Sequence, residues 1–236
     1  MYVTPLFKEE DLPVLHDAIR QSGLATLVTL GADGMEASHV PMLLDSEPAP
    51  FGTLRGHIAR SNPQWQRAAA SGHALAIFLG PDAYISPSWY ATKRETGKVV
   101  PTWNYVAIHV YGPLRFFDDA DRLLAHVTKL TETQEAHRAA PWAVTDAPED
   151  YIGGQLKRIV GFEIPIARLE GKWKMSQNRP PRRRGRGTAS RRRAGGSRRR
   201  QDRGGGERRP GSPVRRARRR ARAQVLERGY GESALA

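Results

Sequence analysis

The sequence predicts a mainly β protein with some helix, folded as a small mixed barrel with peripheral helices. Two observations lead to this fold class. Five or six stretches rich in strand-forming residues follow one another between residues 24 and 168, separated by short turns. A few segments with helical spacing of apolar residues lie before and between these stretches, and the one at residues 118–137 has a polar outer face.

The N-terminal third of the chain predicts two helices and three strands. Asp11 precedes a short amphipathic helix that ends at Gly23. Residues 24–30 and 35–44 form a hairpin around a turn at residues 31–34, and residues 53–59 form a third strand. Asn62 is expected to cap a short helix that has Pro63 in its first helical position and runs to about residue 70.

Between residues 73 and 168 the sequence predicts further strands and helices. Residues 73–79 are apolar enough to be buried on both faces, and residues 80–82 are expected to form a turn. The remaining predicted elements are an extended run at 99–117 broken at Gly112 and Pro113, helices at 118–137 and 148–159, and a last strand at 160–168. The connector at 139–147 is far too long for a helix-turn-helix, so no DNA-reading helix is predicted.

Charge divides the chain into two parts. Residues 181–236 contain 20 Arg, no Lys and four acidic residues, so residues 1–180 hold 18 basic and 20 acidic side chains and carry a net charge of about −2. We therefore predict one domain over residues 1–180 and a disordered, Arg-rich tail over residues 181–236.

Several classes of protein are excluded by what the sequence lacks. It has no cysteine, no basic and apolar leader, and no run approaching the roughly 20 apolar residues that span a bilayer. We expect a cytoplasmic protein that does not enter a membrane. GxSxG, P-loop and GxGxxG patterns are also absent, which argues against hydrolases, kinases and dinucleotide-binding folds.

Two histidines on neighbouring predicted strands are candidates for a ligand pocket. His39 lies on the second strand and His57 on the third, so both rings could reach one cavity if these strands pair. Ordinary hydrogen-bonded barrel histidines explain them equally well. No Cys and no HxH spacing supplies a third ligand, so no metal site is predicted.

Two short segments have the residue types of a phosphate site. Arg60, Ser61 and Asn62 precede a helix N-terminus, where backbone N–H groups favour an anion, although most such sequences are ordinary caps. Lys172 and Lys174 alternate along an extended segment and share a face with Ser176. A solvated edge strand would look the same.

The segments 86–90 and 100–105 are dense in indole, phenol and amide groups, and the second includes Trp103 and Asn104. Such groups suit a flat heteroaromatic ring, because apolar walls cover it and a few directed donors orient it. Structural aromatic residues explain either segment alone.

Seven ordered blocks within residues 1–180 together resemble the PaiB family of FMN-binding negative transcriptional regulators. The blocks are MYVTPLFKEEDL, LATLVTLGADGMEASHVPMLL, LRGHIARSNPQW, ALAIFLGPDAYISPSWY, GKVVPTWNYVAIHVYG, APWAVTDAPEDYI and IVGFEIPIARLEGKWKMSQNRP. The resemblance is specific, because it consists of an ordered series and not of one short pattern.

This resemblance implies an FMN-binding split β-barrel, similar to the pyridoxamine phosphate oxidase superfamily, that works as a homodimer with the flavin at the subunit interface. It makes Arg60, Ser61, Asn62, Lys172 and Lys174 candidates for the phosphate or ribityl group. His39, His57, Trp103 and Asn104 become candidates for the flavin ring or the space facing it. Ser176 and Gln177 are expected to come from the partner subunit.

The resemblance also implies a bacterial repressor. A nearly neutral domain without a recognition helix lacks the positive surface that DNA affinity normally needs. Direct DNA binding by the domain is therefore one hypothesis, beside regulation linked to the flavin. The alternative is an enzyme, an FMN-dependent oxidoreductase acting on a small molecule or on haem.

The tail has two interpretations. It could be an arm that binds nucleic acid non-specifically through phosphate contacts. It also lacks Lys, Ile, Phe, Trp, Asn, His and Met, which is the pattern expected when GC-rich coding DNA is read out of frame. We favour the frameshift.

Overall fold

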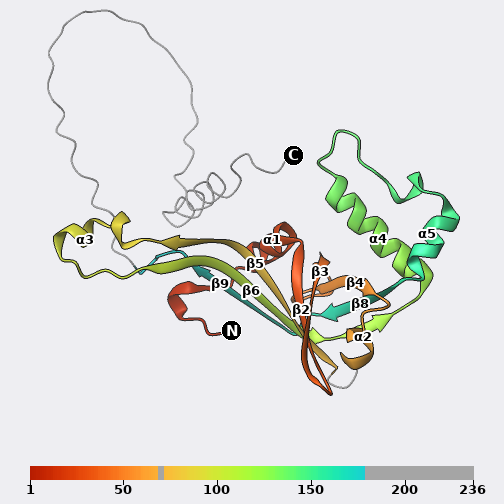
Figure 1. Cartoon of the computed structure of the whole chain (residues 1–236), viewed down its shortest axis with the longest axis horizontal. Helices are drawn as coiled ribbons and strands as arrows, with labels where there is room; N and C mark the ends of the chain where they lie inside the picture. The colour runs from red at the N-terminus through yellow and green to blue at the C-terminus, as the bar shows by residue number, and fades with distance from the viewer. Residues whose placement is uncertain (69–71, 179–236) are drawn as a thin grey trace, which may run out of the picture. The chain divides into compact units, whose positions relative to one another are not determined.

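The computed structural model describes residues 1–68 and 72–178, and the predicted tail at 181–236 lies outside these described residues. Two compact units are present. Of the described residues, the first contains those of Met1–Asp82 and Trp103–Met175, and the second contains Ala83–Thr102 and residues 176–178. Figure 1 shows the strands and helices of the chain with their labels.

Nine strands form one continuous sheet in the described chain, in the order β1-β9-β6-β5-β2-β3-β4-β8-β7. The pairs β1–β9, β2–β3, β2–β5, β3–β4, β4–β8, β6–β9 and β7–β8 are antiparallel. The strands are β1 (Lys8–Glu9), β2 (Leu24–Gly31), β3 (Gly34–Asp45), β4 (Thr53–Ala59), β5 (His73–Ile85), β6 (Thr102–Pro113), β7 (Arg115–Phe117), β8 (Ile159–Pro165) and β9 (Arg168–Lys174).

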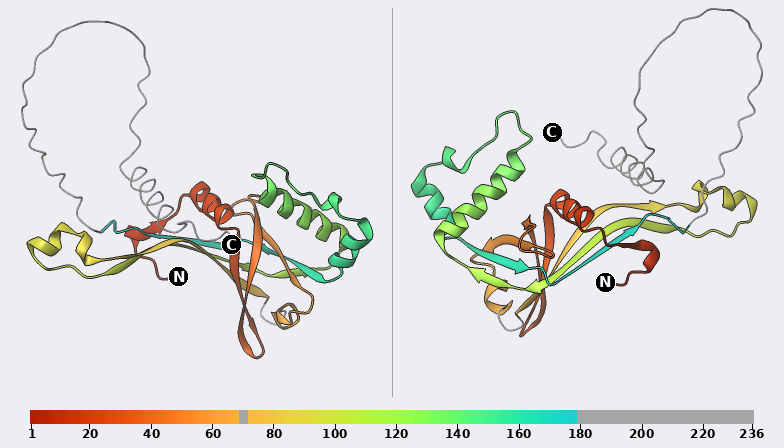
Figure 2. Two further views of the ribbon diagram at one scale, coloured as in Figure 1. Left: turned by 45° about the horizontal axis from the view of Figure 1, so that its top comes forward. Right: turned by 180° about the vertical axis from the view of Figure 1, so that it is seen from behind.

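The helices of the first unit are α1 (Leu12–Ser22), α2 (Gln64–Arg67), α4 (Ala120–Glu135) and α5 (Glu149–Leu156), with short 3-10 turns at η1 (Pro5–Phe7) and η4 (Val144–Asp146). The second unit contains η3 (Pro87–Trp89) and α3 (Ala91–Glu95). Asp11 caps α1 by accepting from the Val14 N–H, and Gly23 ends it with φ of +63°, a conformation that glycine adopts without strain. The views in Figure 2 show α4 and α5 side by side.

β3 changes partners along its length, and this divides the sheet. Its first part pairs with β2, from Gly34 opposite Gly31 to Pro41 opposite Leu24. Its last part pairs with β4, from Met42 opposite Gly56 to Asp45 opposite Thr53. We call the region where β3 and β4 separate, between Pro41 and the end of β4, the split.

The core fills the inner face of the curved sheet. Residues from both halves alternate inward along their strands and are completely buried, with Leu27, Leu54, Phe78 and Phe162 among the largest. Burial of each such side chain contributes roughly 1.5–3 kcal/mol. Gly112 lies where β6 approaches the end of β8, and a Cβ there would collide with the Pro165 carbonyl oxygen. Only glycine allows this close approach.

The predicted fold class is confirmed, while several details of the strands were wrong. The count of five or six strands is too low, because β1 and β7 are very short and the predicted strand at 160–168 ends at Pro165, with β9 following as a separate strand. The predicted turn at 80–82 lies inside β5. The prediction that 73–79 is buried on both faces was also wrong, since Ala74, Ala76 and Phe78 are buried and Leu79 is exposed.

The short helix after β4 begins one residue later than expected. Pro63 occupies the N-cap position and Gln64 begins α2, which ends at Arg67. Asn62 still caps the turn, because its side-chain oxygen accepts a hydrogen bond from the Gln64 N–H at 2.9 Å. The strand at 53–59 and helices α1, α4 and α5 agree with the predicted positions to within a few residues.

Candidate functional site

The side chains of β3 alternate between the two faces of the sheet at the split. Val40, Met42 and Leu44 are buried, whereas His39 is exposed on the opposite, outer face. The His39 ring is oriented by its neighbour on β2, since Nδ1 lies 3.1 Å from Thr26 Oγ1. His39 therefore presents an exposed imidazole beside the point where β3 and β4 separate.

The turn that leaves β4 is attached to β3 from the other side. The Asn62 amide donates to Ser38 Oγ at 2.9 Å, and Ser61 next to it is exposed. Since Ser38 and His39 lie on opposite faces of β3, the turn and the His39 ring approach the split from its two faces. An imidazole, hydroxyl groups and an amide therefore lie close to the split, on β3 and on the turn that follows β4.

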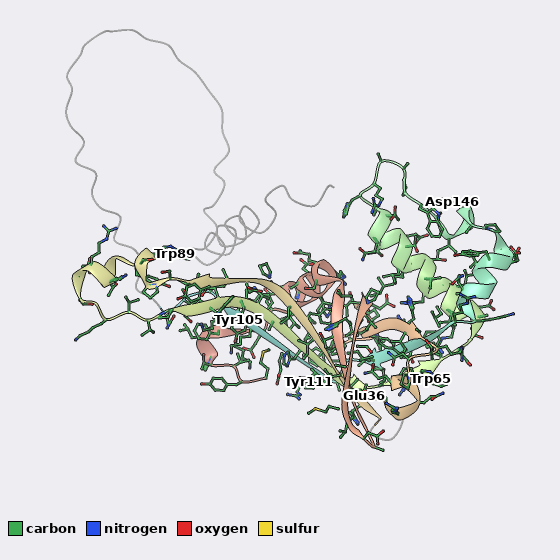
Figure 3. The ribbon with its side chains drawn as sticks, in the orientation of Figure 1. Glu36, Trp65, Trp89, Tyr105, Tyr111 and Asp146 are labelled. Carbon is green, nitrogen blue, oxygen red and sulfur yellow. The ribbon has the colours of Figure 1, made fainter. Side chains whose placement is uncertain are left out.

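Gln64 fixes α2 to the sheet beneath this turn, and sequence reasoning missed it. It is 2% exposed, and its amide donates to the Leu27 carbonyl at 3.3 Å and to Thr29 Oγ1 at 3.0 Å. Figure 3 labels Glu36 on β3 and Trp65 on α2 near this end of the sheet. Its neighbours in α2, Trp65, Gln66 and Arg67, do not signal that this glutamine is buried.

Arg60 lies at the split, yet its guanidinium already has protein partners. Nε donates to the Lys157 carbonyl at 3.0 Å, one terminal nitrogen donates to the Ile159 carbonyl at 3.1 Å, and another lies 3.7 Å from an Asp118 oxygen. These bonds fasten the end of β4 to the start of β8. A phosphate at Arg60 would have to replace or share them.

Lys172 and Lys174 share a face of β9, as the alternation predicted. They pair with Ala107 and Tyr105 of β6, respectively. Lys174 Nζ donates to the Trp103 carbonyl at 2.5 Å, while Lys172, 9% exposed, donates to the Tyr2 carbonyl at 3.0 Å and lies over the Tyr2 and Tyr105 rings. Both ammonium groups are thus engaged by backbone carbonyls. Figure 3 shows Tyr105 on β6.

The remaining predicted site residues lie on β6 or in the second unit. Trp103 is exposed and Asn104 half-buried at the start of β6. In the second unit, Ser176 has a left-handed φ of 60° and its hydroxyl lies 3.3 Å from the Tyr90 hydroxyl, with the exposed Gln177 after it. Ser176 and Gln177 stay predictions as flavin contacts.

His57 is not brought together with His39. Its Nδ1 lies 3.1 Å from Nε2 of His126 on α4, and the two rings meet edge to face with centroids 5.2 Å apart. Burial lowers the pKa of His57, and burial together with the charges of His57 and Arg55 lowers the pKa of His126 to about 4. Both imidazoles are therefore neutral at pH 7. Among residues 1–68 and 72–178, no group of three or more His, Asp or Glu side chains could hold a metal ion.

An apolar outer face lies beside the split. Alternation along β2, β3 and β5 turns a set of large side chains outward, and four of them are more than half exposed: Leu24, Leu30, Met35 and Leu79. We call this set the outer apolar face. Exposed apolar surface of this kind on a sheet marks a place where another molecule or subunit binds.

The residues at the split fit the two chemical halves of FMN. The exposed His39 imidazole, the Ser61 hydroxyl and the Asn62 amide supply the donors that a phosphate and a ribityl chain require. The outer apolar face lies on the His39 side of β3, opposite the turn at Ser61 and Asn62, and suits an aromatic ring system. Arg60 fits less well, because its nitrogens are already bonded.

Comparison with known proteins gives a consistent result. The family described as "Putative FMN-binding domain" matches residues 1–168. The protease synthase and sporulation protein PAI 2 of Bacillus subtilis is 34% identical over 179 residues, which cover 76% of this chain and 83% of that protein. An uncharacterised protein of Emericella nidulans is 34% identical over 212 residues, covering 75% of this chain and 84% of that protein. Relatives therefore occur in fungi as well as in bacteria.

Solved structures share the fold at low sequence identity. The FAD and haem binding protein from Mycobacterium smegmatis has a TM-score of 0.51 at 16% identity, covering 71% of this chain and 73% of that chain. A conserved hypothetical protein from Mycobacterium tuberculosis has a TM-score of 0.53 at 12% identity, covering 84% of this chain and 99% of that chain. These matches confirm the mainly β split-barrel fold. No helix in the described part of the chain is long and apolar enough to cross a membrane.

Because of the His57–His126 pair, we expect the free energy of unfolding to decrease as the pH is lowered from about 6.5 towards 4. Their pKa values are lowered on folding, so the unfolded chain binds more protons as the pH drops below about 6.5, and stability falls until the folded His126 titrates near pH 4. Each pKa unit is worth about 1.4 kcal/mol, and the pKa of His126 falls from 6.5 to about 4, so His126 accounts for a loss of about 3 kcal/mol once it is fully titrated. Urea unfolding at several pH values between 7.5 and 4.5 measures this slope.

The His126→Gln variant should show a shallower slope than the unmodified chain, and the exposed His137→Gln variant should not. Equal slopes in all three proteins would show that the pair does not carry the pH dependence. The lowered pKa of half-buried His109 adds a slope of the same sign, so some dependence on pH remains in every variant.

Proposed function

Since this chain belongs to the PaiB family of FMN-binding proteins, with FMN as its cofactor, we propose that it acts as a homodimeric, flavin-linked negative regulator of transcription. The observation that carries the proposal is the position of the split beside the outer apolar face. His39 and the turn at Ser61 and Asn62 supply polar groups, and the neighbouring strands supply an exposed apolar surface.

The outer apolar face favours a second copy of the chain as the partner. Leu24, Leu30, Met35 and Leu79 come from three adjacent strands, and a two-fold axis would place the same surface on both sides of the interface. A flavin at the split would then lie at the edge of that interface, where the second subunit shields its ring from water. Ser176 and Gln177 are the residues we propose to come from the partner subunit.

The proposed role in regulating transcription is supported by a relative's name and by the charge of the domain. The name of the Bacillus subtilis relative refers to protease synthesis and sporulation. Residues 1–180 carry a net charge of about −2, which disfavours attachment to DNA phosphates. We therefore place control of transcription in flavin-dependent contacts of the dimer, and not in sequence reading by the barrel.

FMN affinity should depend on the polar groups of the split. Ser61→Ala should weaken FMN about tenfold, because a hydrogen bond to a charged phosphate contributes roughly 1.5–3 kcal/mol, and His39→Ala should weaken FMN by a similar factor through loss of its contact with the flavin ring. Quenching of flavin fluorescence during titration of the full chain measures the dissociation constant. Glu132→Gln on the exposed face of α4 is the matched control and should bind like the unmodified chain. Unchanged affinity in both split variants would move the phosphate site elsewhere.

Charge on the outer apolar face should separate the subunits. Met35→Glu and Leu79→Glu each place a carboxylate where burial against a second copy would strip its water, so the mass in solution should fall from dimer to monomer. Light scattering after size exclusion gives the mass, and FMN affinity should fall with it. Tyr151→Glu, which replaces a comparably exposed apolar residue on α5, should stay dimeric. A dimer that survives both substitutions would contradict this interface.

Regulation and catalysis give different results with the FMN-loaded chain. A regulator should enrich a small set of genomic fragments, directly or with a bound partner protein, and should lose this enrichment when FMN is removed. An FMN-dependent oxidoreductase should instead oxidise NADH or NADPH with turnover of an added acceptor, for which haem and menadione serve as probes. Steady turnover without any FMN-dependent enrichment would replace the regulator by the enzyme.

A further inference from the structure

A second cavity lies away from the residues proposed for FMN, between α4 and the outer faces of β3, β4 and β7. Its volume is about 250 Å³, and it is lined by Leu43, Asp45, Arg55, Phe117, Arg122, Ala125, His126 and Lys129. We propose that this cavity binds a small organic monoanion, namely a carboxylate on a compact apolar body such as a single ring.

The walls of the cavity are suited to an apolar body. Leu43, Phe117 and the methyl group of Ala125 contribute carbon surface, and the Arg122 guanidinium lies 4.0 Å from the centroid of the Phe117 ring. A volume of about 250 Å³ is close to the lower end for small-molecule pockets, so a single ring fits better than a nucleotide or a flavin. The shape therefore limits the ligand to a small molecule.

The charges around the cavity leave one positive charge in excess. Lys129 Nζ lies 2.6 Å from Asp45 Oδ1, and Arg55 pairs with the other oxygen of Asp45. Arg55 and Arg122 also approach Glu163, at 3.9 and 3.1 Å. Three cations thus share two carboxylates. Because His57 and His126 are neutral at pH 7, a ligand with one negative charge completes the balance.

His126 forms part of the inner wall of the cavity. Its side chain is 95% buried and lines the cavity, and its Nε2 lies 3.1 Å from Nδ1 of His57, so one of the two neutral imidazoles donates to the other. Nδ1 of His126 is buried away from solvent. The ring therefore adds an uncharged aromatic surface to the cavity, and a ligand that fills the cavity packs against it.

This cavity can be tested separately from the proposed FMN site, because none of its lining residues belongs to the split. The probe is benzoate, and benzamide is the neutral control of the same size. Calorimetry on the FMN-loaded full chain should show benzoate binding at least about tenfold more tightly than benzamide, as expected for a charge-assisted contact. The nitrogen NMR signals of the His126 ring should shift with benzoate.

Variants of the lining residues distinguish the effect of charge on benzoate affinity from the effect of cavity shape. Lys129→Gln and Arg122→Gln remove the excess charge and should weaken benzoate about tenfold each, while Ala125→Leu fills the cavity without changing charge and should also weaken it. The exposed Lys157→Gln changes net charge equally outside the cavity and should have no effect. All four substituted side chains, at Arg122, Ala125, Lys129 and Lys157, are exposed, so the variants should fold.

Four outcomes would overturn the proposal. The first is equal affinity for benzoate and benzamide, and the second is equal weakening by Lys157→Gln. The third is displacement of benzoate by FMN, which would assign the cavity to the flavin site. No heat and no NMR shift up to about 10 mM benzoate would also reject it, since weaker binding carries no specificity. The FMN titration is measured on the same protein, so loss of one site is distinguishable from loss of the other.

Discussion

The change of partner along β3 is the constraint on which the rest of this structure depends. Gly34–Pro41 must pair with β2, and Met42–Asp45 must pair with β4, so the strand passes from one half of the sheet to the other. The inner faces of both halves close over a single core that includes Leu27, Leu54 and Phe162. A slip of one residue in either pairing would turn buried side chains outward, so the core fixes the position of the split.

Each half of the sheet then uses its outer face differently. The half that contains β2 and β5 leaves Leu24, Leu30 and Leu79 exposed, and this is the surface that we propose to meet a second copy of the chain. The half that contains β4 and β8 is attached to α4 by the His57–His126 contact and by the ion pairs of Arg122 with Glu163 and of Lys129 with Asp45. One barrel therefore carries an exposed apolar surface and a charged cavity, separated by the split.

Local pattern was sufficient for most elements and failed where distant segments intervene. The bounds of β4 were predicted correctly because alternation and turn residues are encoded within the strand itself. Residues 80–82 have the composition of a turn, yet they continue β5, and a Cβ at Gly80 would collide with the side chain of Val106 on β6. Gly80 is thus a site of close strand packing, which composition alone does not distinguish from a turn. β1 was missed because its two residues gain their pairing from β9, far along the chain.

The sequence by itself determined the fold class, most of the helices and strands, the FMN cofactor and the polar segments around Ser61 and Lys172. These properties follow from periodicity and from ordered blocks of residues, both of which are local. The tertiary structure alone decided which partner each polar group finds. His57 meets His126, 69 residues away, and Arg60 bonds the carbonyl of Ile159, 99 residues away. The physical reason is that a hydrogen bond depends on distance and direction in space, and only the completed sheet brings such groups within 3 Å or so of each other.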